Sequence, residues 1–171
     1  PLSSASGQIQ AISSLDAFVA KYDQQGNFLW VKGWDASKCW EVTTDAIGSV
    51  YVFSEFVNTF DADPGTGIFN VSSAGDEDIF LIKLTLAGNF VWAKTTGSGS
   101  YESSGDIKYS NNSIYICGQY SDTMDIDFGT GLSLLQPYNN SNSYIAKYDT
   151  SGNLIWAKTI GDSSYIRLEA I

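Results

Sequence analysis

The chain has 171 residues, a net charge of −10 at neutral pH and a sequence pI near 4.1. Such acidity argues against nucleic-acid partners, whose phosphates attract basic surfaces, and against binding to anionic membranes. A hydrophobic content of 43% suffices for a folded core. No apolar run approaches the roughly 20 residues that span a bilayer, so membrane insertion is not expected.

The first predicted element, at 16–30, reads DAFVAKYDQQGNFLW and returns twice in the chain. The second copy is DIFLIKLTLAGNFVW at 78–92, and the third is SYIAKYDTSGNLIW at 143–156. The copies are 62 and 64 residues apart, as their last residues show: Trp30, Trp92 and Trp156. A second pair, at 49–67 and 113–131, repeats between them with an offset of 64. Fixed periods of this length indicate a repeat architecture.

Each full repeat is predicted to contain four short strands. Residues 1–40 form half a unit with a preceding connector, 41–104 and 105–164 form two complete units, and 165–171 form the first strand of another. In the first complete unit the strands are expected at 41–45, 50–56, 79–84 and 90–95. In the second they are expected at 106–109, 114–120, 144–148 and 154–159.

Gly-Asn pairs join the last two strands of each unit, at Gly26-Asn27, Gly88-Asn89 and Gly152-Asn153. Glycine supplies a positive φ and asparagine tolerates one, so these pairs predict hairpin turns and antiparallel sheets. Helical periodicity is nearly absent, which leaves an all-β chain.

Runs such as VYVF, IFLI and IYIC are apolar on both faces, so each sheet must lie between two other layers. Without helices, those layers are copies of the same sheet. The sequence therefore predicts a β-propeller segment of four-stranded antiparallel blades, about two and three-quarter blades with a period of 62–64 residues. The repeated tryptophans are expected to be buried wedges between blades. Propellers usually have about 4–8 blades, so the segment is expected either to belong to a longer polypeptide or to assemble with copies of itself.

Catalytic chemistry has little support in the sequence. Histidine is absent, which removes Ser-His-Asp and Cys-His triads and histidine-ligated metal sites. Cys117 lies in a predicted strand and is expected to be a buried free thiol, whereas Cys39 lies in a connecting segment. Hydrolysis by a carboxylate pair at the central channel is the enzymatic alternative, because nineteen acidic residues are present.

One polar motif recurs, Asp-x-Asp-x-Gly-x-Gly. Its carboxylates are Asp61 and Asp63 in the first complete unit and Asp125 and Asp127 in the second. Two carboxylates on a loop that bends at glycine can converge on calcium, which favours oxygen ligands. The competing interpretation is that the aspartates cap their own turns through local hydrogen bonds. Both interpretations stay open from the sequence.

The run D-x-F-x-x-K, then G-N-x-x-W-A-K, then x-V-Y-V, resembles the SBBP-type β-propeller repeats of secreted and surface proteins of Bacteroidetes-like bacteria. Those repeats often carry D-F-D-P-G, which appears here as DADPG at 61–65 and DIDFG at 125–129. The first copy lacks the central Phe and the second lacks the Pro. Ser54 also replaces the usual strand glycine, which Gly118 keeps. The resemblance implies an exported location and a scaffold or adhesive role.

The expected function is a non-catalytic extracellular or cell-surface scaffold, adhesion or partner-binding segment of a larger exported protein. Its expected partners are proteins or surface glycans, with no nucleic acid. The first alternative is a structural subunit that polymerises through open blade edges into a ring or fibre. The second is an enzyme with an acidic site in the central channel.

Overall fold

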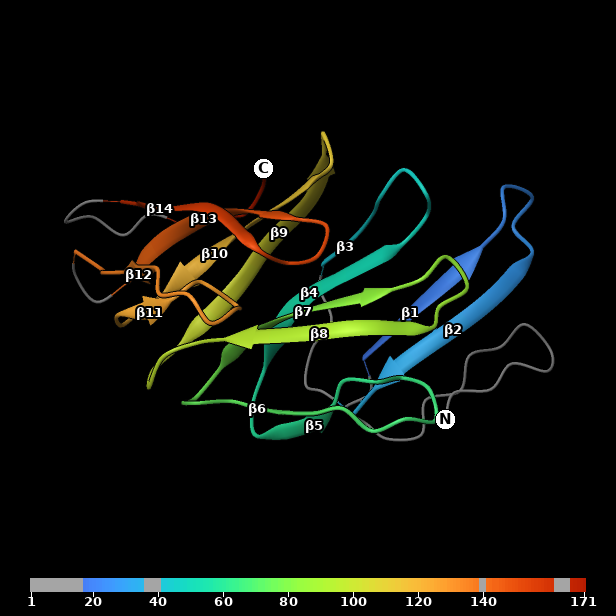
Figure 1. Cartoon of the computed structure of the whole chain (residues 1–171), viewed down its shortest axis with the longest axis horizontal. Coiled ribbons are helices and arrows are strands. Elements are labelled where there is room, and N and C mark those ends of the chain that lie inside the picture. Colours follow the sequence, from blue (N-terminus) through green and yellow to red (C-terminus); the bar gives the residue numbers. More distant parts are fainter. Residues whose placement is uncertain (1–16, 36–40, 139–140, 162–166) are drawn as a thin grey trace.

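The computed structural model describes residues 17–35, 41–138, 141–161 and 167–171, and these residues form β-strands without a helix. They therefore contain no helix that could cross a membrane. Three antiparallel sheets lie side by side along the long axis of the molecule (Figure 1). The prediction of an all-β fold of four-stranded antiparallel sheets is confirmed.

The sheets follow the repeat. We call them the half blade, the central blade and the C-terminal blade. The half blade contains β1 (Ala17–Tyr22) and β2 (Phe28–Trp34). The central blade has the order β3-β4-β7-β8, with β3 (Glu41–Thr44), β4 (Val50–Phe56), β7 (Asp78–Leu84) and β8 (Phe90–Thr96). The C-terminal blade has the order β9-β10-β13-β14, with β9 (Glu102–Ser110), β10 (Ser113–Tyr120), β13 (Asn142–Asp149) and β14 (Leu154–Ile160).

The structure also contains two short antiparallel strand pairs that the sequence did not predict. They lie between the second and third strands of each complete blade, where the Asp-x-Asp motifs are. Their strands are β5 (Thr59–Asp61), β6 (Asn70–Ser72), β11 (Met124–Asp125) and β12 (Leu134–Leu135). Strands of two or three residues carry too little alternation to be recognised from the sequence.

The Gly-Asn turns are hairpins, as predicted, but only their glycines have a positive φ. Gly26, Gly88 and Gly152 have φ values of 82°, 78° and 75°. Each hairpin shifts the strand register beside the turn, which is the pattern of a bulge that glycine accommodates. The asparagines instead make hydrogen bonds. Asn27 and Asn153 donate their side-chain amides to an aspartate four residues earlier, at 2.8 and 2.9 Å.

The expected strand at 165–171 is not found in its described part, because residues 167–171 have no strand assignment. A strand needs a hydrogen-bonded neighbour, and no described strand pairs with this segment. Its backbone instead reaches the C-terminal blade. Leu168 N donates to Ser143 Oγ at 2.9 Å, and Ile171 N donates to Asp106 Oδ2 at 2.9 Å. Residues 1–16, which include most of the predicted N-terminal connector, and Cys39 lie outside the described residues.

The central blade buries both of its faces, as its two-sided apolar strands predict. Alternate residues of β4 serve two cores, because successive side chains of a strand point to opposite faces. Val50 and Val52 pack with Trp34 of the half blade. Tyr51 and Phe53 belong to the core shared with the C-terminal blade. The prediction of a free, buried Cys117 on β10 is confirmed.

The repeated tryptophans occupy equivalent register positions, each opposite a lysine of the neighbouring strand, but they are not fully buried. Trp30 and Trp92 are half-buried and pack against the cores between blades, as predicted for wedges. Trp156 is 37% exposed. The expectation of complete burial is therefore wrong, because these residues lie on the outer strands and Trp156 has no described blade against it.

Candidate functional site

The two Asp-x-Asp loops have the same geometry. Asp61 Oδ1 accepts hydrogen bonds from Asp63 N at 3.0 Å and from Phe69 N at 2.8 Å. Asp63 Oδ1 accepts one from Gly65 N at 2.8 Å. The second loop repeats the three contacts in its residues Asp125, Asp127, Gly129 and Ser133, at 3.1, 2.8 and 2.8 Å. The predicted turn-capping role is directly visible in both loops.

The residue between the two aspartates fixes each loop to a core. Ala62 and Ile126 are fully buried. The carbonyl of Ala62 accepts a hydrogen bond from Trp34 Nε1 at 3.0 Å, and that of Ile126 accepts one from Tyr148 Oη at 2.7 Å. The motif therefore places a buried residue between two caps, which accounts for its recurrence without a ligand.

Calcium binding by Asp61, Asp63, Asp125 and Asp127 stays a prediction. Within the described ranges, no group of three or more histidine, cysteine, aspartate or glutamate residues is arranged to hold a metal ion. Each loop brings two carboxylates together, and a calcium ion there would need backbone carbonyls and water for most of its 6–8 oxygen ligands.

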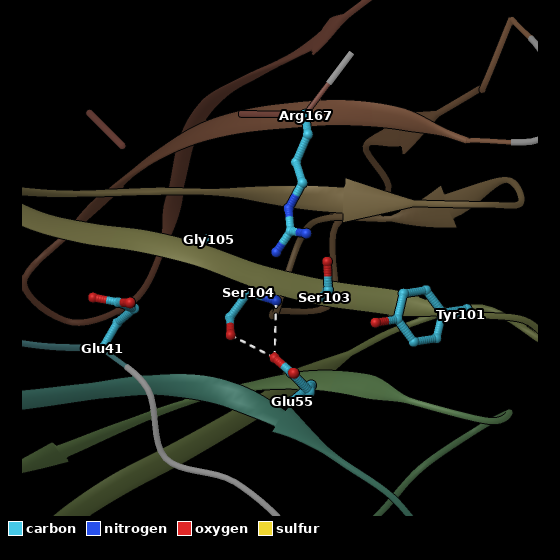
Figure 2. A pocket seen from close by; sticks show the side chains of 7 residues that line it. All are labelled: Glu41, Glu55, Tyr101, Ser103, Ser104, Gly105 and Arg167. Atoms are coloured by element: carbon cyan, nitrogen blue, oxygen red, sulfur yellow. Dashed lines mark hydrogen bonds between the residues drawn. The ribbon is translucent and has the colours of Figure 1, made fainter. Parts of the chain in front are cut away.

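A pocket of about 310 Å³ lies where the central and C-terminal blades meet at their first strands. Figure 2 shows the side chains around it, from β3, β4, β9 with the residue before it, and the C-terminal segment. The lining residues are Glu41, Glu55, Tyr101, Ser103, Ser104, Gly105 and Arg167. The pocket therefore lies along the first strands of both complete blades, the strands that would face the axis if the blades close into a propeller.

Two carboxylates give the pocket its acidic character. The Glu55 carboxylate accepts hydrogen bonds from the Ser104 backbone N–H at 3.1 Å and from the Ser104 hydroxyl (Figure 2). Burial, and to a smaller degree the Asp106 carboxylate, raises the pKa of Glu41. The one lining cation, Arg167, is paired with Glu169 at 2.9 Å on an exposed surface. A cation placed beside Glu41 would stabilise the charged carboxylate and so lower its raised pKa.

A second acidic feature lies at two loops, the β6–β7 loop within the central blade and the β8–β9 loop that connects it to the C-terminal blade. Asp78 Oδ2 accepts a hydrogen bond from Ala74 N at 2.8 Å, and Glu102 accepts bonds from Ser98 N at 2.7 Å and Ser98 Oγ at 2.6 Å. Both acids are almost fully buried, and burial raises the pKa of each. The contacts are with the backbone of Ala74 and with the backbone and hydroxyl of Ser98, so these acids serve to hold the two loops.

The sequence did not single out the pocket residues. The second unit has Gly105 and Gln119 at the positions of Glu41 and Glu55. Comparing the two units therefore reveals no shared motif at these positions. One signal was available. Glu55 interrupts the apolar strand VYVFSEF, and a charged residue in a buried strand is uncommon unless it is paired.

No protein-family model matches the chain. An uncharacterized WD repeat-containing protein of Acanthamoeba polyphaga mimivirus is 27% identical over 168 residues, which cover 86% of this chain. The match spans 12% of that relative's length. WD repeats form four-stranded propeller blades, so the similarity agrees with the sheets seen here. The resemblance to SBBP-type repeats stays a prediction.

Proposed function

We propose that the chain is a non-catalytic, protein-binding scaffold made of propeller blades. The observation that carries the proposal is the acidic pocket at the junction of the first strands, on blades that otherwise consist of packing and turn-capping contacts. The similarity to a WD repeat-containing protein supports the scaffold role. Ser104 bonds to Glu55, but the sequence lacks the histidine of a Ser-His-acid triad.

The preferred ligand of the pocket is a lysine or arginine side chain of a partner protein. Glu41 is partly desolvated beside Asp106, so its charged form gains from a neighbouring cation. The net charge of −10 would also attract a basic partner over longer distances. The complete partner surface would involve the rest of the ring.

The test is binding to an array of basic, neutral and acidic peptides, followed by calorimetry on the best binder. We expect basic peptides to be preferred, and Glu41→Gln to weaken binding about tenfold because the substitution removes one charge at nearly constant shape. The matched control is Asp76→Asn, an exposed acid outside the pocket, which should leave the affinity unchanged. Equal binding of acidic peptides, or no effect of Glu41→Gln, would refute the proposal.

We further propose that the chain acts outside the cell or at its surface, with adhesion to proteins or glycans as part of its role. The support is the resemblance of its two Asp-x-Asp loops to those of exported repeat proteins. Protease treatment of intact producing cells tests this placement. Loss of the chain while cytoplasmic markers survive would support it, and complete protection would contradict it.

A further inference from the structure

Adjacent blades are joined by corresponding contacts in the two described junctions. In the first junction, Lys21 Nζ and Trp30 Nε1 of the half blade donate to one acceptor, the Leu86 carbonyl, each at 3.1 Å. Leu86 lies in the β7–β8 turn of the central blade. The Trp30 ring also covers Gly88 of that turn, so closely that an added Cβ would lie 3.0 Å from the ring.

The second junction repeats this arrangement one repeat later, with the lysine and tryptophan 62 residues on and the turn 64 residues on. Lys83 Nζ of the central blade donates to the Thr150 carbonyl at 3.0 Å, and Tyr51 Oη donates to the same oxygen at 3.4 Å. Thr150 stands in the β13–β14 turn where Leu86 stands in the β7–β8 turn. The Trp92 ring covers Gly152 of that turn, with an added Cβ 3.2 Å from it. We call the lysine and tryptophan on one blade (Lys21 and Trp30, or Lys83 and Trp92) the lysine–tryptophan row. It receives the turn between the last two strands of the next blade.

The C-terminal blade carries the same row on its outward face. Lys147 Nζ lies 5.3 Å from the Tyr115 ring centre, and the rings of Tyr115 and Trp156 are 6.3 Å apart. The matching distances in the central blade are 5.1 and 6.2 Å. The row is therefore already in the arrangement that receives a turn. Trp156 is nevertheless 37% exposed, and no described turn lies against it.

The half blade carries the complementary part, an outer turn that no described tryptophan covers. Gln24 stands in the β1–β2 turn where Leu86 and Thr150 stand in the later turns, and it is exposed. Gly26 has the same positive φ as its two counterparts. An added Cβ on Gly26 would meet no described atom within 4 Å.

We propose that two copies of this chain associate head to tail. The Tyr115–Lys147–Trp156 row of one copy receives the β1–β2 turn of the next, with Lys147 Nζ and Tyr115 Oη donating to the Gln24 carbonyl as Lys83 and Tyr51 do to Thr150. The occupant follows from the two internal junctions, because each shows this row closed by this kind of turn. The interface is heterologous, so repetition closes a ring or extends a filament. This association is separate from partner binding at the acidic pocket.

Sedimentation velocity over a concentration series tests the association. We expect the 171-residue chain to associate as its concentration rises, and Trp156→Ala to weaken association at least tenfold. Lys147→Gln should weaken it less, because the ring contact remains. Ile68→Ala is the matched control, since Ile68 is 79% exposed on a different loop. It should associate as the unmodified chain does.

A mixing experiment tests the head-to-tail geometry. Gly26→Asn blocks the turn with a side chain that tolerates positive φ, whereas Trp156→Ala removes the opposite face. Each variant alone should remain monomeric, and their mixture should form a one-to-one dimer through the two intact faces. A chain that stays monomeric at all concentrations would overturn the proposal. So would association that Trp156→Ala does not weaken, or a mixture of the two variants that forms no dimer.

Discussion

Gly118 on β10 shows how one residue adjusts a repeat to its own core. A Cβ there would clash with the Ser103 carbonyl and would lie 2.6 Å from Tyr144 Oη. The central blade has Ser54 at this place and Phe80 where the C-terminal blade has Tyr144, so the hydroxyl of Tyr144 fills the space that a side chain would need. Tyr144 Oη donates to the Ser103 carbonyl at 3.1 Å.

We therefore expect Gly118→Ala to lower the free energy of unfolding by about 1–3 kcal/mol, the usual cost of overpacking a core. Urea unfolding measures the loss. Gly99→Ala is the matched control, because an added Cβ at Gly99 meets no described atom within 4 Å. Equal stabilities of the two variants would show that Tyr144 moves aside without cost.

The aspartate caps can be separated from metal binding by paired substitutions at Asp61. Asp61→Ala removes the acceptor of two backbone N–H groups and should cost about 1–3 kcal/mol, whereas Asp61→Asn keeps an acceptor oxygen and should cost less. Thermal unfolding checks both variants. If the loop binds calcium, saturating calcium should raise the melting temperature of the unmodified chain, and Asp61→Asn should reduce this rise. Identical melting curves in calcium and chelator would leave turn capping alone.

At the scale of the elements, the loops before β7 and β13 differ between the two complete blades. The central blade has a buried Asp78 where the C-terminal blade has Asn142, which caps its own loop by accepting from Tyr138 N at 2.6 Å. Burial raises the pKa of Asp78 in the folded state. An acid with a raised folded pKa stabilises the fold below its unfolded pKa. That stability is lost as the pH rises through the folded pKa.

We expect Asp78→Asn to stabilise the chain at pH 7.5 and to reduce the loss of stability between acidic and neutral pH. Glu102 also has a raised pKa, because of its own burial first and the nearby Asp78 carboxylate to a smaller degree, so part of the pH dependence should remain. Urea unfolding of both chains at several pH values checks this. A variant less stable than the parent at pH 7.5 would show that the carboxylate makes a contact that an amide cannot replace.

The tryptophan wedges give a prediction about the junctions. Trp92→Ala should lower the free energy of unfolding by about 2–3 kcal/mol. This is below the about 3–5 kcal/mol of a fully buried tryptophan, because Trp92 is half-buried. Trp156→Ala, measured at a concentration where the chain is monomeric, should cost less than about 1 kcal/mol. Similar losses for both would mean that Trp156 is covered within a single chain.

The strands and blades could be predicted because their cause is local and repeated. The segment VYVFSEF gave β4 its observed bounds, since seven residues that bury both faces stand out from polar turns. The pocket could not be predicted, because Glu55 and Ser104 meet only when two blades stack, and neither residue is repeated in the other unit. Tryptophan burial was overestimated because period and residue type do not show how far out on a blade a strand lies.

At the scale of the whole molecule, the central blade is complete and its two neighbours are each open on one side. The half blade exposes Phe18 (47%), whose counterpart Phe80 in the central blade is buried, and the C-terminal blade exposes Trp156 (37%). Such exposed apolar residues at the ends of a stack are typical of repeats that need a cap or a neighbour. Each copy carries a net charge of −10, so electrostatic repulsion between two copies opposes their association at these ends.

The two proposed associations should therefore respond to salt in opposite ways. Copies of the chain repel each other, so raising NaCl from 20 to 200 mM should strengthen head-to-tail association by screening this repulsion. A basic peptide at the Glu41 pocket is attracted, so the same change should weaken its binding. Sedimentation and calorimetry in the same buffers measure the two effects. If salt weakened self-association, the contact would depend on charge pairs that the lysine–tryptophan row does not contain. If salt left peptide binding unchanged, the pocket would bind its ligand without using the carboxylates.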